Sequence, residues 1–427
     1  MDEFTLFRRY FEALLFALTQ ADRIYGEQTR NPVVNVFISK MDGFFSWILL
    51  CLRHLEDLFQ GRDDVQLRVY RSIFDFGTVF MTFMCDSPAI KAAMQSSIIV
   101  ADILVLLWTW IDRRTQRPLF MIEPDPKEAE CHGCIINCML YSYTLDSDDA
   151  KRLLLDRFSD EGFGYAAAER FVLAGMAHAD RMREASERDE WDHRIIGRNY
   201  RQIVEMFDGF TKIGDPTLIA ALRNSSFIQV FVSGISAFTK RLWVEESPST
   251  YLYPLMLISC EVQEWIDTPG IPTNDGICQL VRGGFFSIFL EATLYGPKSI
   301  AKGNKMSENW DTICKELVAL VMAYASYRSA LFAIREAIAN LDPTQCEKLL
   351  AMVESTPTSA LWKMLEAAFL CVITYGMIKP QELGKLAPAI SRHAPVVILP
   401  YIVPKPVRKS IGISAIATTV QRSVKNI

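Results

Sequence analysis

The chain lacks the sequence motifs of several common enzyme classes. It has no Gly-x-Ser-x-Gly nucleophile elbow, and no glycine-rich phosphate loop follows a strand pattern, so neither a serine hydrolase nor a nucleotide-binding enzyme is indicated. Alternating strand patterns with hairpin signals are also missing, which argues against a β-rich fold. The closest histidine–carboxylate neighbours are His178 with Asp180 and Asp192 with His193. We expect surface or capping roles for these histidines, which number only 5 in the chain.

Charge is scarce, and one end of the chain lacks acidic residues. Only 22% of residues are charged and 50% are hydrophobic, so the chain can bury a large core and is not expected to be disordered. The net charge of −5 provides no general attraction to nucleic acid, and we expect no nucleic-acid partner. No acidic residue follows Glu382. Residues 395–427 are therefore expected to form a basic, partly ordered and solvated tail.

Long apolar runs and a secretory leader are missing as well. The N-terminus has no basic region followed by an apolar core, which argues against secretion. The longest apolar run, Ile98–Ile111, contains Asp102 and is shorter than the roughly 20 residues of a spanning helix. We expect a buried helix there and no transmembrane segment. The 10 cysteines are scattered through helical patterns, as expected for reduced thiols in the cytoplasm or nucleus.

Helical periodicity is what the sequence has in abundance. From Phe4 to about His393, apolar residues recur every three or four positions between short polar or Pro/Gly joints. The first helix, Phe4–Tyr25, has an apolar stripe formed by Leu6, Tyr10, Leu14, Leu15 and Leu18. Further helices are expected over Val33–Leu58, Val65–Phe83, Ala89–Ser96, Ser97–Ile111, Glu128–Tyr143, Asp148–Arg157, Gly164–Arg183, Tyr200–Phe210, Asp215–Arg223, Ser226–Trp243, Tyr251–Ile266, Gly276–Leu294, Asn309–Leu341, Pro343–Glu354, Thr358–Tyr375 and Lys379–His393.

This pattern predicts an all-α fold built as a degenerate armadillo/HEAT-like α-solenoid, a right-handed superhelical stack of helices. No repeat has a strict period, which argues against tetratricopeptide and ankyrin arrays. We expect two helical-repeat lobes, residues 1–185 and 194–394. The most charged stretch, Glu184–His193, is either a hinge between these lobes or the exposed end of a helix.

Two groups of residues are weak candidates for metal ligands. Cys131, Cys134 and Cys138 have a spacing that could place three thiols on one helical face. Zinc thiolate sites usually need four ligands and no second Cys-x-x-Cys exists, so packing of three small residues in the core is favoured. Asp146, Asp148 and Asp149 could bind a divalent cation, but their pattern resembles a helix cap.

Asn309, Thr312 and Glu316 share the spacing of the second metal motif of class I terpene cyclases, which are also all-α enzymes. The aspartate-rich first motif of those enzymes has no good match in this chain. A metal-dependent all-α enzyme is therefore an alternative hypothesis, while the expected protein has neither a catalytic site nor a cofactor.

Three segments resemble the long helical region of the basidiomycete fungal MYND-type zinc-finger proteins. They are Ile98–Thr115, Tyr200–Phe238 and Ala360–Gly376, and Leu107-Trp108 matches a Leu-Trp pair that is common at the end of an apolar helix in that family. The finger needs paired Cys-x-x-Cys units and a closing Cys/His group, but no cysteine follows Gly376. The family's zinc ligands cannot be assigned here, so this member lacks the finger or the chain ends before it.

Taken together, these patterns favour a non-catalytic scaffold or regulator that binds another protein. A helical stack leaves an extended surface that receives a partner helix or extended segment. A regulator whose MYND finger is missing from this chain is the third hypothesis. The sequence identifies neither the partner nor the oligomeric state.

Overall fold

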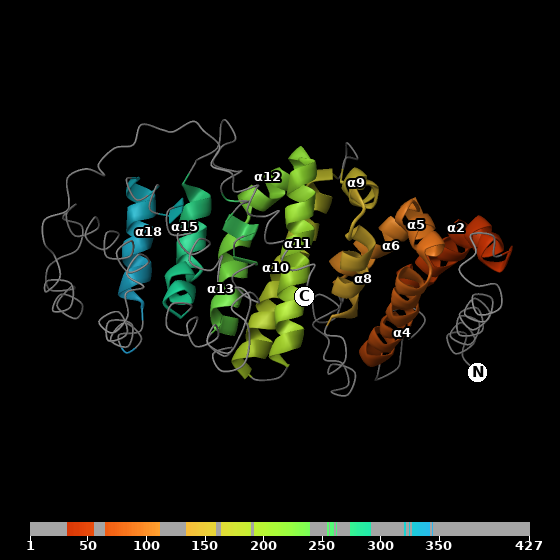
Figure 1. Ribbon diagram of the computed structural model, residues 1–427, viewed down its shortest axis with the longest axis horizontal. Helices are drawn as coiled ribbons and strands as arrows, with labels where there is room; N and C mark the ends of the chain where they lie inside the picture. The colour runs from red at the N-terminus through yellow and green to blue at the C-terminus, as the bar shows by residue number, and fades with distance from the viewer. Residues whose placement is uncertain are drawn as a thin grey trace, which may run out of the picture. The chain divides into compact units, whose positions relative to one another are not determined.

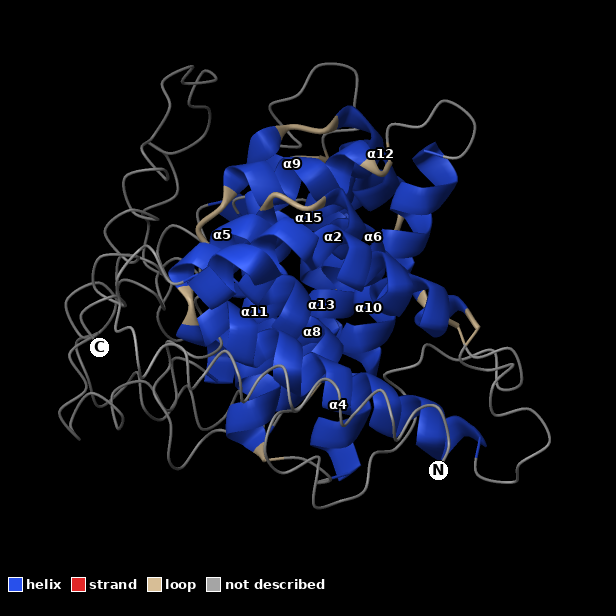
Figure 2. Cartoon of the chain, turned by 90° about the vertical axis from the view of Figure 1, so that its right-hand side faces the viewer, coloured by secondary structure: helices blue, strands red, loops and turns tan. Residues whose placement is uncertain are grey.

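The structure is a computed structural model. It describes residues 32–54, 65–111, 134–158, 164–188, 192–239, 274–291 and 327–341, with a few single positions between 254 and 344. These residues are 88% helical and contain no strand, which confirms the predicted all-α class for the described part of the chain (Figure 2). The chain divides into two compact units, Met1–Arg241 and Leu242–Ile427. The predicted lobes, 1–185 and 194–394, have different limits from these units.

The helices of the first unit contact one another step by step along the chain. Helix α2 contacts α5 and α6, α6 contacts α8, α9 and α10, and α10 contacts α11, α12 and α13 (Figure 1). Their bounds are α2 (Pro32–Arg53), α4 (Val65–Asp86), α5 (Pro88–Gln95), α6 (Ile98–Thr109), α8 (Ile135–Thr144), α9 (Asp148–Asp156), α10 (Gly164–Arg188), α11 (His193–Ile213), α12 (Pro216–Asn224) and α13 (Phe227–Thr239). Each apolar face is thus buried mainly by helices close in sequence.

Side-chain caps determine where several of these helices begin. Ser87 accepts a hydrogen bond from a first-turn backbone N–H of α5, and Asp215 does the same for α12. Both helices begin with proline, at Pro88 and Pro216. A polar cap followed by proline satisfies an exposed backbone donor and presets the first turn, and the helices expected from Ala89 and from Asp215 begin within one residue of these prolines.

The charged stretch Glu184–His193 joins two helices of the same unit. Helix α10 continues to Arg188, beyond the expected end at Arg183, and α11 begins at His193. The two helices contact each other. Arg183 forms an ion pair with Glu187 one turn further along, with an N–O distance of 3.2 Å. Of the two interpretations left open by the sequence, the described residues of this stretch fit the exposed end of a helix.

Aromatic rings fill the core where α10, α11 and α13 meet. Phe171 of α10 lies edge-on to Phe207 and Phe210 of α11, with ring centroids 5.7 and 5.8 Å apart. Phe227 of α13 lies 4.7 Å from Phe207. All four side chains have no exposed surface. Large aromatic side chains contribute most of the apolar area that a core removes from water, so this cluster anchors the three helices.

Two helices of the second unit are fully described, α15 (Asp275–Arg282) and α18 (Arg328–Ala339), and they contact each other. Arg282 of α15 pairs with Glu336 of α18 at 3.6 Å. The prediction of one continuous helix over Asn309–Leu341 is wrong, because Tyr327 is the extended N-cap residue of α18. Apolar periodicity continues across such a break, and for that reason the sequence pattern misses it.

Candidate interaction surface

Two of the three candidate zinc-binding cysteines lie in described residues. Cys134 is the N-cap of α8 and Cys138 lies in its first turn, and both are partly buried. Burial raises the pKa of Cys134 to about 12 and that of Cys138 to about 11. Both thiols are therefore protonated at neutral pH in the metal-free protein. Cys131 lies outside the described residues, among which no group of three His, Cys, Asp or Glu side chains could hold a metal ion.

The candidate terpene-cyclase residues Asn309, Thr312 and Glu316 lie outside the described residues. Their spacing remains a prediction.

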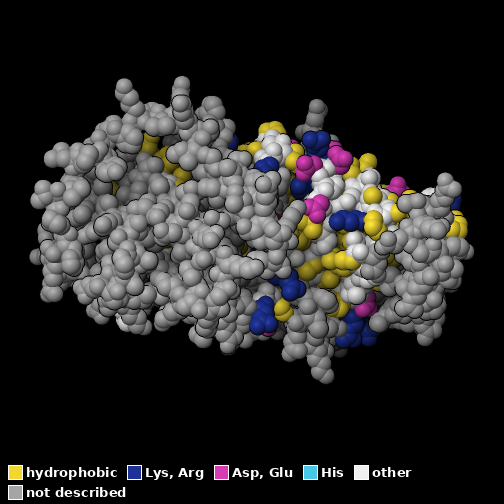
Figure 3. Space-filling model, in the orientation of Figure 1, with side chains coloured by type: hydrophobic (Ala, Val, Ile, Leu, Met, Phe, Trp, Pro, Cys, Tyr) yellow, Lys and Arg dark blue, Asp and Glu magenta, His cyan; other side chains and the backbone are white. Residues whose placement is uncertain are grey.

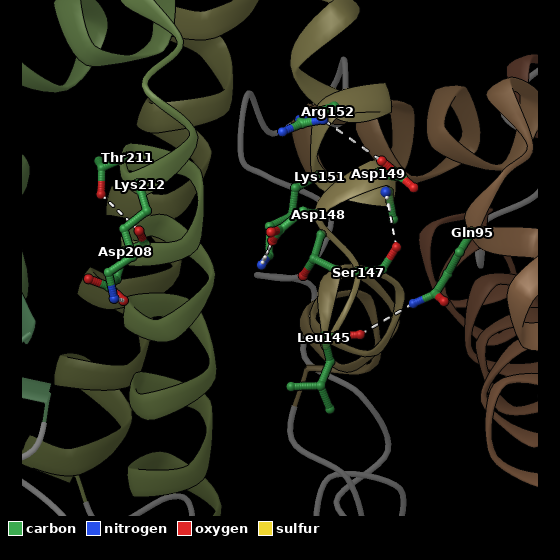
Figure 4. A network of polar contacts seen from close by, with 12 residues as sticks. Gln95, Leu145, Ser147, Asp148, Asp149, Lys151, Arg152, Asp208, Thr211 and Lys212 are labelled. Carbon is green, nitrogen blue, oxygen red and sulfur yellow. Dashed lines mark hydrogen bonds and ion pairs between the residues drawn. The ribbon is translucent and has the colours of Figure 1, made fainter. Parts of the chain in front are cut away.

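The acidic run before α9 serves the helix start. Ser147 caps α9, and Asp148 and Asp149 lie in its first turn, where carboxylates interact favourably with the helix dipole (Figure 4). Asp148 binds the ammonium group of Lys151 at 2.8 Å, and Asp149 lies 4.0 Å from the guanidinium group of Arg152. The hydrogen bond from Lys151 lowers the pKa of Asp148. The resemblance to a helix cap is confirmed for Asp148 and Asp149.

The expected surface or capping role is wrong for His178. This side chain is only 3% exposed and stacks on the Trp108 indole, with ring centroids 4.2 Å apart. Burial lowers the pKa of His178 well below its usual value, so the imidazole is neutral. Asp180 instead pairs with Arg183 at 3.3 Å. Residues two positions apart on a helix point in different directions, which explains why this pair is not a histidine–carboxylate dyad.

A polar seam joins α8 to α11. The Asn137 amide donates hydrogen bonds to Asn199 at 2.8 Å and to Gln202 at 3.0 Å. One turn further along, the Tyr141 hydroxyl donates to Glu205 at 2.6 Å. These groups bind one another, and buried amide pairs of this kind define which residues of two helices lie side by side. The seam therefore aligns the two helices and presents no activated nucleophile.

A polar stripe of α11 forms ion pairs at the edge of the core. Arg201 pairs with Glu205 at 2.9 Å, and Lys212 pairs with Asp208 at 2.6 Å (Figure 4). Burial raises the pKa of Asp208, and the hydrogen bond from Lys212 opposes that change. On the face drawn in Figure 3, acidic and basic side chains are intermingled over α9 nearby. The carboxylates of both pairs are mostly buried, with side-chain exposures of 18% for Glu205 and 10% for Asp208, so the charges of this stripe are paired within the chain.

Helix α2 differs, because it is apolar on two opposite faces. Its inner face packs on α5 and α6, and Asp42 at the edge accepts a 2.7 Å hydrogen bond from Ser97. The inner side chains, none more than 7% exposed, are Val34, Phe37, Met41, Phe45, Ile48 and Leu52. At about 100° per residue, Val36, Gly43 and Leu50 fall on the opposite side of the helix.

We call this opposite face the outer seam; it comprises Val36, Lys40, Gly43, Trp47 and Leu50. The exposed fractions of its three large apolar side chains are 62% for Val36, 48% for Trp47 and 55% for Leu50. Single exposed apolar residues are ordinary on protein surfaces, whereas a row of them along one helix face is a candidate binding surface. The helical prediction for Val33–Leu58 did not identify this seam. The recurrence of Val36, Gly43 and Leu50 every seven residues is the signal that could have done so.

Gly43 lies at the middle of the outer seam. A Cβ atom added at this residue would have no heavy atom within 4 Å. Glycine in a helix interior lowers stability by about 0.5–1 kcal/mol relative to alanine. No described neighbour is close enough to require glycine at this position. On a helix surface, small residues allow the backbone of another helix to approach closely.

One described helix is long and apolar enough to cross a membrane, namely α2 from Val34 to Arg53. Two bent pairs, Pro88–Gln95 with Ile98–Thr109 and Pro216–Asn224 with Phe227–Thr239, would meet the same criterion if each were one span. Length and composition alone define this criterion. In α2, Phe45 and Ile48 pack in the core of the unit, and Lys40 lies on the outer seam.

Comparisons with known proteins assign no family. No protein-family model matches the chain, and neither curated proteins nor solved structures give a match. The resemblance to MYND-type proteins therefore remains a prediction from the sequence.

Proposed function

We propose that the protein is a non-catalytic interaction scaffold, and that the outer seam of α2 binds an α-helix. The observation that carries this proposal is the row of exposed apolar side chains opposite the buried face of a 22-residue helix. A helix that is apolar on two opposite faces is suited to burial on both of them. The outer seam would complete its burial by receiving an apolar helix face from a partner.

The arrangement of the helices supports a stack of the degenerate armadillo/HEAT-like type. In the first unit, contacts run mostly between helices that are close in sequence, as they do in solenoids. We propose that this α-solenoid presents its surface to another protein. The thiols of Cys85, Cys134 and Cys278 suit action in the cytoplasm or nucleus.

The dimensions of the outer seam fit one partner helix. Leu50 lies fourteen residues after Val36, so the seam is about 21 Å long at roughly 1.5 Å per residue. A partner helix of about four turns would cover this length. Its apolar residues would have to recur at three- and four-residue spacing to contact Val36, Trp47 and Leu50 together.

Site-specific photo-crosslinking tests this proposal. A photo-crosslinking amino acid replaces Leu50 in the full chain, and the protein is irradiated in extract from its native cells. We expect discrete protein adducts from this position, because Leu50 is 55% exposed on the seam. Mass spectrometry of the adducts identifies the contacting segment and shows whether it has helical apolar periodicity.

The matched control places the same amino acid at Leu173, which is 49% exposed on α10. Both positions are exposed leucines in long helices of the same unit. Adducts that form equally from positions 50 and 173 would mean non-specific contact. No protein adduct at position 50 would contradict the proposal.

A further inference from the structure

We propose that the helix bound by the outer seam is α2 of a second copy of this chain, in an antiparallel dimer whose two-fold axis passes at Gly43. This inference rests on the proposed function, since it names the partner of the same surface. It also goes further, because it fixes the direction and the register of the partner helix.

The spacing of the outer seam is symmetric about Gly43. Val36 lies seven residues before it and Leu50 seven residues after it. When two copies of one helix cross antiparallel at a residue, each position before that residue faces the equivalent position after it in the other copy. Val36 of one copy therefore faces Leu50 of the second copy, and this contact occurs twice. These are the two most exposed apolar side chains of α2, at 62% and 55%.

Gly43 leaves open space at the point where two crossing helices would come closest. The crossing point is where two helix backbones come closest, and a side chain there would hold them apart. Gly43 has no heavy atom within 4 Å of a Cβ position. Ser39 and Ser46, which flank it one turn to either side, are small and exposed. Gly43 makes no stabilising contact within the described part of one chain. At the crossing of two α2 helices, its missing side chain would let the backbones approach each other.

The same register gives Lys40 a favourable place. The two Lys40 side chains would lie on opposite sides of the crossing, with their Cα atoms about 9 Å apart along the axis at roughly 1.5 Å per residue. Each ammonium group would lie near the Trp47 ring of the other copy, because Lys40 precedes Gly43 by about one turn and Trp47 follows it by about one turn. An ammonium group over an indole face is attractive, so the only charged residue of the seam adds to the contact.

Charge complementation tests the register. In analytical ultracentrifugation of the full chain, the wild type should be a dimer. Val36→Glu and Leu50→Lys should each weaken it by at least ~100-fold in Kd, because each substitution disrupts two buried apolar contacts. The double variant Val36→Glu/Leu50→Lys should recover much of the affinity, since the glutamate introduced at position 36 would face the lysine introduced at position 50 of the second copy. Leu173→Glu is the matched control and should leave the dimer unchanged.

Several outcomes overturn the dimer. These are a wild type that stays monomeric at every concentration, a double variant that is no better than the single ones, and a Leu173→Glu variant that dissociates as well. Thermal melts check that Val36→Glu and Leu50→Lys remain folded, which we expect because both positions are exposed.

Photo-crosslinking from position 50 distinguishes failure of the dimer from failure of the proposed function. Adducts to α2 of a second copy support the dimer. Adducts to another protein overturn the dimer but still support a scaffold that binds a different protein. Adducts to residues 4–25 of the same chain overturn the dimer as well. A third outcome is that no protein adduct forms, that the wild type floats with phosphatidylcholine/phosphatidylserine vesicles, and that Leu50→Lys abolishes flotation. This result would overturn both the dimer and the scaffold proposal and would assign the outer seam to a membrane surface.

Discussion

Helices α2 and α11 have nearly the same length, 22 and 21 residues, yet the stripes opposite their most apolar faces differ. The stripe of α11 has ion pairs one turn apart, Arg201–Glu205 and Lys212–Asp208, whose carboxylates are mostly buried. That of α2 has Val36, Gly43 and Leu50. The charges of the α11 stripe are paired within the chain, whereas exposed apolar side chains gain free energy when they leave water. The comparison teaches that α11 is complete within the chain, while α2 is suited to a further contact.

The largest expected effect is a difference in unfolding free energy between substitutions on the two faces of α2. Phe45→Ala should lower the free energy of unfolding by about 3–5 kcal/mol, because Phe45 is fully buried and its loss leaves a cavity. Leu50→Ala, at low protein concentration, should change it by less than about 0.5 kcal/mol. Urea denaturation of the two variants measures both values. Equal losses would mean that the outer seam is part of the core of a single chain.

The polar seam between α8 and α11 should show the next largest effect. Asn199→Ala removes the acceptor 2.8 Å from the buried Asn137 amide and should cost about 1–3 kcal/mol. Arg198→Ala, at the exposed neighbouring position, should stay within about 0.5 kcal/mol. Chemical denaturation of both variants compares them. A harmless Asn199→Ala would show that the amide pair does not align these helices.

The buried imidazole of His178 predicts a pH dependence. Its pKa is lowered in the folded protein, so below about pH 6.5 the unfolded chain binds a proton that the folded chain does not. Stability should therefore be unaffected by this group above pH 7. It should fall by up to about 1.4 kcal/mol for each pH unit below 6.5. Denaturation from pH 7.5 to 5 in wild type and His178→Gln measures the effect; identical slopes would contradict it.

The smallest expected effect concerns two glycines in helices. Gly43→Ala should raise the stability of the monomer by about 0.5–1 kcal/mol, because a methyl group there meets nothing. Gly175→Ala should lower stability, since its Cβ would lie 2.8 Å from the Phe207 ring. Thermal melts at low concentration compare the two. A destabilising Gly43→Ala would mean that a contact within one chain already uses the space.

Much of the fold followed from apolar spacing and from capping residues. Helices begin at Pro88 and Pro216, within one residue of the expected starts, because proline after a polar cap suits the first helical position. The pattern failed at Tyr327, where the helix predicted over Asn309–Leu341 is broken. Periodicity reports only the spacing of apolar residues. A short break in the helix need not change that spacing, so the sequence pattern does not show the break.

The candidate sites depended more on the tertiary structure. Sequence reasoning expected a surface or capping role for His178, because nothing local signals that an imidazole stacks on Trp108 from another helix. It also marked the whole of Val33–Leu58 as helix without separating its two apolar faces. Only the packing of α5 and α6 on one face left Val36 and Leu50 on the other.

By itself, the amino-acid sequence determined that the chain forms helices and where several of them begin, because spacing and capping act within a few residues. The tertiary structure decided which side of each helix is covered, because burial depends on elements distant in the sequence. Identical apolar side chains, such as Leu52 in the core and Leu50 on the outer seam, therefore have different roles two residues apart.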